Sequence, residues 1–237
     1  MPSPLLRPFT WLTNRDGLFL IGMLVVVCGV WGFIHLADSI RENHAPKFDE
    51  IANRYFHEHP GPPLVAEAAR DITGMGGIVV LTLVVAAVAG FLLITRRYGM
   101  MVFVLVATSG GLGLTLSLKH VIDRPRPAER AAGVIVYTQS FPSGHSVLSA
   151  TIYLTLGGLL ARTTKSRVLQ FYFLILAALA SFLIGCSRIY LGAHYPTDVL
   201  AGWTIGLVWS LFCWLVAREL QRRKVVEREA PAEGSAV

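Results

Sequence analysis

Long apolar stretches separated by short polar segments dominate the chain. A helix needs about 20 mostly apolar residues to cross the hydrocarbon core of a membrane. Six uncharged stretches have this length: Gly17–Ala37, Ile72–Thr95, Tyr98–Leu118, Phe141–Ala161, Val168–Ser187 and Val199–Ala217. The pattern predicts an all-α, polytopic membrane helix bundle with six transmembrane helices near residues 17–37, 76–95, 98–118, 143–161, 168–187 and 199–217.

The composition supports this interpretation. Of the 237 residues, 54% are hydrophobic and only 15% are charged, whereas soluble domains carry about 25% charged residues. An ordinary soluble enzyme is therefore excluded, and we expect one membrane-embedded domain over residues 1–237 with 218–237 as a tail. The net charge of +6 is explained by basic residues that flank spans, so no nucleic-acid partner is expected. The three cysteines lie inside apolar stretches and have neither disulfide nor zinc spacing.

The distribution of Lys and Arg predicts the orientation, because cytoplasmic loops are enriched in these residues. With six spans, both termini share one side with the second–third and fourth–fifth loops. That side carries 12 of the 21 Lys and Arg residues, and the other side carries nine. Three of the nine are Lys119, Arg126 and Arg188, which belong to polar clusters that suit anion binding. Without these three, the comparison is twelve against six. We therefore expect cytoplasmic termini and extracytoplasmic polar clusters.

Segment 38–71 is expected on the extracytoplasmic side. Within it, residues 45–59 mix Phe48, Ile51, Tyr55 and Phe56 with charged residues at near-helical spacing. This pattern predicts a helix, either lying in the membrane interface or solvated and packed on the spans. The role of the segment stays open.

Three polar clusters interrupt the apolar background. They occupy residues 119–127 after the third stretch, 141–145 at the start of the fourth, and 187–198 between the fifth and sixth. In a six-span chain all three lie on the same face of the membrane. Separate parts of the sequence are thus expected to meet at one site.

The first and third clusters supply cations, namely Lys119, Arg124, Arg126 and Arg188. Guanidinium groups bind phosphate oxygens bidentately, and lysine acts as a compact point charge. Pro125 and Pro127 predict that the chain leaves the helix in the first cluster. For Arg124 alone, a lipid headgroup or an acidic loop is as good a partner as a substrate.

The second cluster predicts a helix start that can bind an anion. Unpaired N–H groups and the helix dipole favour negative charge there. Gly144 allows close approach of a ligand, and Ser143 either donates its hydroxyl or caps the helix. Capping alone leaves His145, at the start of a membrane span, without an explanation.

In the third cluster, His194 and Asp198 are four residues apart, and Pro196 suits the first position of a helix. Asp198 can then accept a hydrogen bond from one ring nitrogen of His194 and leave the other free as a nucleophile. The alternative is a capping aspartate beside an interfacial histidine.

Together, the three clusters resemble the motifs of the type-2 phosphatidic acid phosphatase family. The matching patterns are Lys-x6-Arg-Pro at Lys119–Pro127, Pro-Ser-Gly-His at Pro142–His145 and Ser-Arg-x5-His-x3-Asp at Ser187–Asp198. All three are complete and in order. The short string Asp71–Gly74 also resembles bacterial members.

The resemblance implies a phosphatase that works without a metal or other cofactor, through a phosphohistidine intermediate. It implies that His194 is the nucleophile, that Asp198 orients it, and that His145 protonates the leaving oxygen and then activates water. The implied phosphate-binding residues are Lys119, Arg126, Ser143, Gly144, Arg188 and Ser187.

The expected substrate is a lipid phosphate or diphosphate in a bacterial inner membrane. Phosphatidylglycerol phosphate, undecaprenyl diphosphate, phosphatidic acid and the 1-phosphate of lipid A all suit such a site. Two alternatives stay open, a phosphotransferase that passes phosphate to a second lipid and a non-enzymatic lipid transporter that retains an anion site. The six spans argue against the soluble vanadium haloperoxidases, which resemble the family at the same motifs. The oligomeric state is open.

Overall fold

The computed structural model describes residues 14–42, 46–127 and 139–222 of the chain, and the regular elements in this part are all helices. In order these are α1 (Asn14–Arg41), α2 (Lys47–Glu58), α3 (Pro63–Gly74), α4 (Ile78–Ile94), α5 (Tyr98–Val121), α6 (Gly144–Arg162), α7 (Arg167–Tyr190) and α8 (Pro196–Arg222). The all-α class is confirmed.

Six membrane crossings are present if one bent helix pair is counted as a single span. Helices α1, α5, α6, α7 and α8 are each long and apolar enough to cross a membrane, and α3 with α4 passes the same test as a pair bent by 44°. The apolar stretch from residue 72 to 95 is therefore interrupted. Gly74, Gly76 and Gly77 surround the break, and glycine is costly inside a helix because it loses the most backbone freedom.

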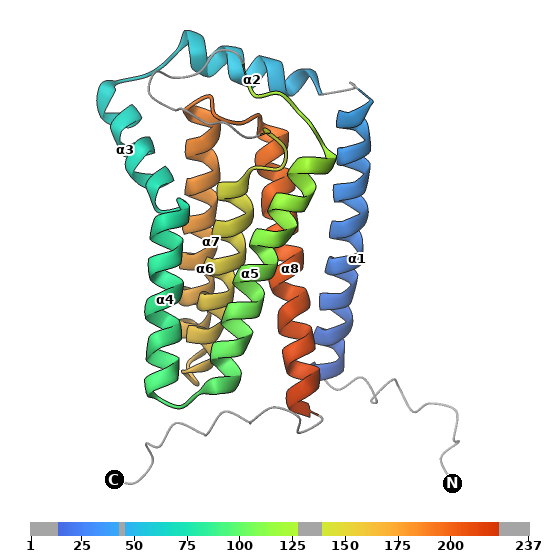
Figure 1. The fold of residues 1–237 in the computed structure, drawn as a ribbon, viewed down its shortest axis with the longest axis vertical. Coiled ribbons are helices and arrows are strands. Elements are labelled where there is room, and N and C mark those ends of the chain that lie inside the picture. Colours follow the sequence, from blue (N-terminus) through green and yellow to red (C-terminus); the bar gives the residue numbers. More distant parts are fainter. Residues whose placement is uncertain (1–13, 43–45, 128–138, 223–237) are drawn as a thin grey trace, which may run out of the picture.

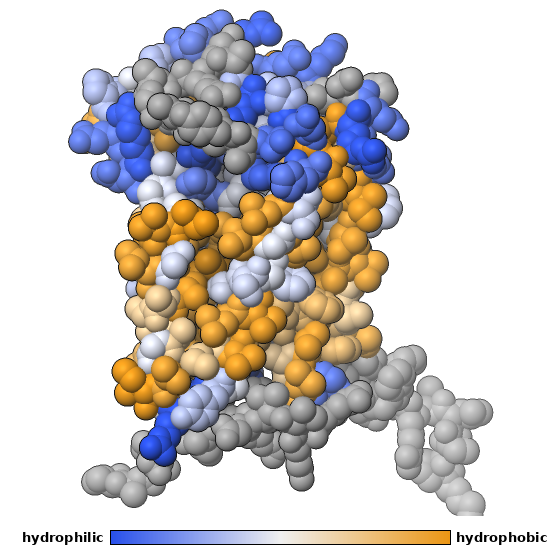
Figure 2. Space-filling view, in the orientation of Figure 1, coloured by the Kyte–Doolittle hydropathy of each residue, from blue (hydrophilic) through white to orange (hydrophobic). Residues whose placement is uncertain are grey.

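The spanning helices lie side by side, and α2 lies across one end of the bundle (Figure 1). The start of α1 and the end of α8 are at the opposite end. On the face shown in Figure 2, hydrophobic residues form a belt across the middle of the bundle, and hydrophilic residues gather at the end that carries α2. This distribution matches a multi-pass membrane protein, in which the belt contacts lipid tails and the polar end lies at the level of the headgroups or beyond.

Helix α6 is central to the bundle, and small residues let α8 approach it closely. A Cβ atom at Gly202 would lie 2.6 Å from the Cβ of Ser146 and 2.9 Å from the carbonyl oxygen of Ser143. Gly206, one turn later, makes a similar approach to Ala150. Close packing at small residues is a main source of helix association in membranes, where lipid tails are as apolar as the helix surfaces. These glycines therefore place the start of α8 against the start of α6.

We expect Gly202→Ala to destabilise the bundle, because the new methyl group would collide with the Cβ of Ser146 and the backbone carbonyl of Ser143. Overpacking of this kind costs about 1–3 kcal/mol. The matched control is Gly90→Ala in α4, where a Cβ meets no atom within 4 Å. Thermal unfolding in detergent measures the effect, and equal midpoints for the two variants would contradict this packing.

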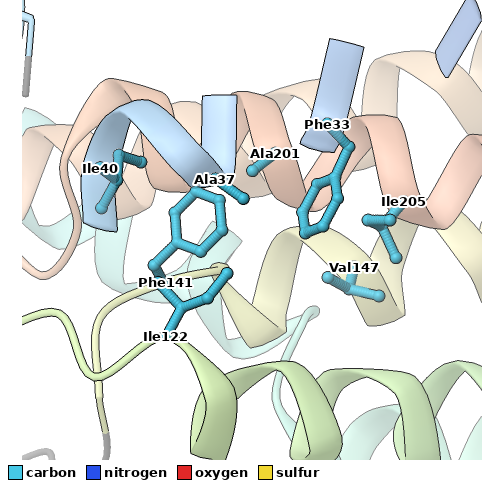
Figure 3. Close-up of a cluster of buried hydrophobic side chains, with 8 residues drawn as sticks. All are labelled: Phe33, Ala37, Ile40, Ile122, Phe141, Val147, Ala201 and Ile205. Atoms are coloured by element: carbon cyan, nitrogen blue, oxygen red, sulfur yellow. The ribbon is translucent and has the colours of Figure 1, made fainter. Parts of the chain in front are cut away.

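A cluster of buried hydrophobic side chains joins α1 to the polar end of the bundle (Figure 3). Phe33 of α1 and Phe141 stack with ring centroids 5.7 Å apart, and Phe141 is fully buried. The remaining members are Ala37, Ile40, Ile122, Val147, Ala201 and Ile205. Because Phe141 immediately precedes the Pro-Ser-Gly-His segment, the cluster fixes that segment against α1 and α8.

Helix α2 covers most of the helix predicted at residues 45–59. Its Phe56 ring contacts Tyr190 at the end of α7, with centroids 5.8 Å apart. The face toward the bundle carries the fully buried Asp49, while Phe48, Ile51 and Tyr55 are exposed. The helix is therefore packed on the spans, and contact of its exposed apolar side with the membrane surface stays a prediction.

Candidate active site

Four helix ends meet beneath α2 and bring the three polar clusters together (Figure 1). Lys119 lies in the last turn of α5, and Arg188 lies in the last turn of α7. His145 lies in the first turn of α6, and Asp198 lies in the first turn of α8. Electrostatic interactions connect His145 with His194, Arg188, Arg126 and Lys119, so these groups share one site.

His194 and Asp198 are adjacent and almost completely buried. The His194 Nδ1 atom lies 3.4 Å from the Asp198 Oδ2 atom, and the exposed fractions of the two side chains are 2% and 0%. The backbone N–H of Tyr195 donates to the same Asp198 oxygen at 3.0 Å. Helix α8 begins at Pro196, and its first turn therefore holds the carboxylate beside the imidazole.

The hydrogen-bond partners of His194 assign its tautomer. Nη1 of Arg126 lies 3.0 Å from the His194 Nε2 atom. A guanidinium group has donors only, so Nε2 must accept and carries no proton. The ring proton is then on Nδ1, which faces Asp198. The lone pair of Nε2 points toward the Arg126 guanidinium.

Burial lowers the pKa of His194 to about 4, and the nearby cations Arg126 and Arg188 act in the same direction. Asp198 opposes this shift because its negative charge favours the protonated ring. The neutral imidazole consequently persists well below the usual histidine pKa of about 6.5. The ring of His194 is therefore neutral throughout the neutral pH range, which the predicted nucleophilic role requires.

We expect the ring nitrogens of His194 to titrate near pH 4 and to keep the neutral Nδ1–H form at pH 5 and above. The measurement is a pH series of ¹⁵N NMR spectra of histidine-labelled protein in detergent, with His194→Gln used to assign the signal. A midpoint between pH 6 and 7 would contradict the buried, cation-lined environment.

Backbone carbonyl groups position two of the three predicted phosphate-binding cations. Lys119 Nζ donates to the carbonyl oxygen of Gln139 at 2.5 Å, and Arg126 Nη2 donates to the same oxygen at 3.2 Å. Arg126 also donates to the carbonyl of Ala193 at 2.7 Å. The segment at Gln139, which precedes α6, thus holds both cations close to His194.

Arg188 is buried and has an unused donor. Its Nη1 donates to the Thr73 hydroxyl at 3.2 Å, but its Nε–H, with the side chain only 4% exposed, has no acceptor among the described residues. A buried guanidinium N–H without a partner is costly, and so is a cluster of like charges. An anion placed among Lys119, Arg126 and Arg188 relieves both costs.

The start of α6 forms another wall of the site. Ser143 is fully buried and is the N-cap residue of α6, but its side chain makes no capping hydrogen bond. Its hydroxyl instead accepts a hydrogen bond from Ser146 at 3.0 Å. The prediction that the Ser143 side chain caps the helix is therefore wrong, while its part in phosphate binding stays a prediction. A Cβ at Gly144 would lie 3.8 Å from Cε of Lys119, so the open N–H end of the helix lies next to this cation.

His145 is half-buried and packs against the break between α3 and α4. A Cβ at Gly76 would lie 3.3 Å from the His145 Cδ2 atom.

The Ser187 hydroxyl forms a hydrogen bond within its own helix, donating to the Ile184 carbonyl at 2.7 Å. A part for Ser187 in phosphate binding stays a prediction, and this hydrogen bond gives the hydroxyl a structural use.

Sequence reasoning missed several residues that hold the site together. Thr73 contacts Arg188, Ser140 donates a hydrogen bond to Asp198, and Asp49 pairs with Arg124. Only Thr73 had a signal, the Asp71–Gly74 string before the second span. Arg124 has acidic partners, as one of its two interpretations expected.

In the described part of the chain, no three His, Cys, Asp or Glu side chains are grouped so as to hold a metal ion. The site instead combines two histidines, one carboxylate and three buried or partly buried cations. This donor set suits an oxyanion such as a phosphoryl group.

Comparison with known proteins gives the same family as the motifs. Residues 98–222, more than half of the chain, match the PAP2 superfamily. Phosphatidylglycerophosphatase B of Bacillus subtilis is 32% identical over 181 residues, which cover 74% of this chain and 86% of that protein. A lipid A 1-phosphatase of Rhizobium etli is 33% identical over 127 residues, or 50% of each chain.

A solved structure extends the likeness to most of the fold. The crystal structure of a transmembrane PAP2-type phosphatidylglycerolphosphate phosphatase from Bacillus subtilis superposes with a TM-score of 0.74 and 25% identity. The match covers 86% of this chain and 98% of that one. On the matched residues and this coverage, the chain belongs to the PAP2 superfamily.

Proposed function

We propose that the chain is an integral-membrane lipid phosphatase that hydrolyses a lipid phosphomonoester or diphosphate through a phosphohistidine at His194. One observation carries the proposal: the unprotonated Nε2 atom of a buried histidine lies 3.0 Å from the guanidinium of Arg126. Arg188, which acts electrostatically on the same histidine, has an N–H without an acceptor among the described residues. A phosphoryl group held by these donors lies next to the nucleophilic nitrogen.

In the first chemical step, the lone pair of His194 Nε2 forms a bond to phosphorus while the bond to the lipid oxygen breaks on the opposite side. His145 donates a proton to the departing oxygen. Phosphoryl transfer depends mainly on in-line positioning and charge stabilisation. Lys119, Arg126 and Arg188 supply the positive charge around the equatorial oxygens.

In the second step, His145 removes a proton from water, whose oxygen attacks phosphorus as the P–N bond breaks. Inorganic phosphate leaves, and His194 returns to its neutral form. While the ring carries the phosphoryl group, its Nδ1–H faces Asp198. The carboxylate therefore stabilises the positive charge that develops on the imidazole.

The substrate is a lipid because the site lies at the polar end of a bundle whose middle is apolar (Figure 2). A headgroup phosphate can reach the site while its acyl chains remain in the membrane. The named relatives are phosphatases of phosphatidylglycerol phosphate and of lipid A. Candidate substrates are these two lipids, undecaprenyl diphosphate and phosphatidic acid.

We further propose that the protein resides in a bacterial cytoplasmic membrane with the site facing outward. The excess of Lys and Arg at the terminal side supports this orientation. In a cysteine-free variant, Glu58→Cys should react with a membrane-impermeant thiol reagent in intact cells, whereas Lys165→Cys should react only after lysis. Both side chains are exposed. The reverse pattern of labelling would show that the site faces the cytoplasm.

Phosphate release from a panel of the four candidate lipids, using purified protein in detergent, tests the function. We expect release from at least one lipid and no loss of activity in EDTA. Product analysis in the presence of a second lipid separates hydrolysis from phosphotransfer, because a transferase yields a phosphorylated lipid in place of free phosphate. If no lipid is dephosphorylated and none acquires phosphate, the chain is not a phosphatase of this class.

A further inference from the structure

Behind the histidine and its aspartate lies a buried ionic network that reaches into α2. Arg124 connects two carboxylates: Nη1 is 2.6 Å from Oδ1 of Asp198, and Nη2 is 2.8 Å from Oδ2 of Asp49. Both aspartates are fully buried, and Arg124 is only 8% exposed. Arg124 therefore lies between the candidate active site and α2, a helix that precedes five of the six spans in the sequence.

The same network also contacts the start of α8. Oδ1 of Asp49 accepts a hydrogen bond from the backbone N–H of Thr197 at 3.0 Å, and Arg124 donates to the Thr197 hydroxyl at 2.8 Å. The guanidinium also lies over the Tyr195 ring, 4.2 Å from its centroid. The turn that carries His194 into α8 is thus held through side chain, backbone and ring contacts.

The two oxygens of Asp198 have separate tasks. Oδ1 accepts from Arg124, while Oδ2 faces His194 and accepts from Ser140 and the Tyr195 backbone N–H. A buried carboxylate needs such compensation to stay ionised and fixed in direction. Because Arg124 binds Oδ1 from one end and Asp49 holds the other end of the guanidinium, the direction of Oδ2 depends on both.

We propose that Asp49 and Arg124 are positioning residues for phosphoryl transfer, which orient Asp198 and through it the ring of His194. Helix α2, which lies outside the segment matched to the PAP2 superfamily, is then part of the catalytic apparatus. This inference rests on the proposed phosphatase function. It assigns to segment 38–71 a role in catalysis that its sequence did not predict.

The first test compares Asp49→Asn with Glu50→Gln, a charge-removing change at the adjacent, exposed position of α2. Asparagine retains an acceptor for the Thr197 N–H but loses the charge that fixes Arg124. We expect kcat to fall about 10–100-fold, by analogy with the loss seen when an outer partner of a metal-binding histidine is removed. KM and inhibition by orthovanadate should be unchanged, because the three phosphate-binding cations are intact. Glu50→Gln should match the wild type.

The second test is chemical rescue of Arg124→Ala. A pocket of about 370 Å³ is lined by Arg124, Asp49 and Tyr195, so a small cation can reach the vacated position. Added guanidinium should restore part of kcat in Arg124→Ala and leave Arg41→Ala, which changes another residue lining the pocket, unaffected. Arg124→Lys should be intermediate, because an ammonium group cannot bridge both carboxylates in the same geometry.

A double variant separates positioning from folding. If Asp49 acts through Arg124, Asp49→Asn should cause little further loss in the Arg124→Ala background. Unchanged kcat in Asp49→Asn, multiplicative losses in the double variant, or a loss explained wholly by a lower fraction of folded protein would each overturn the inference. Failure of the wild type to release phosphate would instead refute the proposed function.

Discussion

Replacing His194 with alanine should abolish turnover and leave no phosphorylated protein. Its Nε2 atom is the proposed acceptor of the phosphoryl group. A water molecule in the space left by the ring would be a weaker nucleophile than the imidazole that Asp198 supports. Loss of a covalent nucleophile in other hydrolases lowers kcat by about 10⁴-fold or more. Steady-state phosphate release and phosphoenzyme trapping measure the two effects separately.

The matched control is His120→Ala. His120 lies next to Lys119 near the end of α5, but its side chain is exposed. Its replacement should leave turnover and protein folding near wild-type levels. If His194→Ala retains more than about 1% of kcat while folding normally, covalent catalysis by His194 is wrong.

Replacing His145 with alanine should lower kcat by about 10²–10⁴-fold, the usual contribution of a general acid or base. The size of the loss should depend on the leaving group. An aryl phosphate with an acidic phenol departs without a proton, so the first step should be least affected with such a substrate. The second step still needs a base, and phosphorylated protein should therefore accumulate in His145→Ala.

Burst kinetics with an aryl phosphate test this division of labour. His145→Ala should give a rapid burst of phenol followed by slow turnover, whereas the wild type should show a smaller burst or none. Equal losses for lipid and aryl substrates, with no accumulation of phosphorylated protein, would show that His145 has another role.

The hydrophobic pattern predicted the bundle well because a membrane imposes a simple length requirement. The predicted number of spans is confirmed when α3 and α4 count as one, as are the all-α class and the membership of the PAP2 family. The bend within residues 72–95 was not predicted, since mean hydropathy does not register the glycines at 74, 76 and 77. The break matters for the site, because it packs against His145.

The sequence could predict that the motif residues lie together, because consecutive spans cross the membrane in opposite directions and place the three clusters on one side of the bundle. The structure brings His145, His194, Lys119, Arg126 and Arg188 together as expected, and their catalytic roles stay predictions. The sequence allowed an acidic partner for Arg124 but did not identify Asp49 as that partner. The two residues are 75 positions apart, and a buried aspartate on an amphipathic helix looks like any solvated charge until its packing is known.

The most direct test of the account is to identify the atom that carries the phosphoryl group. Protein is mixed rapidly with an aryl phosphate labelled with ³²P in the transferred phosphate, quenched without acid because phosphohistidine is acid-labile, digested and mapped. The phosphohistidine mechanism predicts an acid-labile, base-stable label on the peptide containing His194, absent in His194→Ala and increased in His145→Ala. A label on His145, or undiminished labelling of His194→Ala, would contradict it.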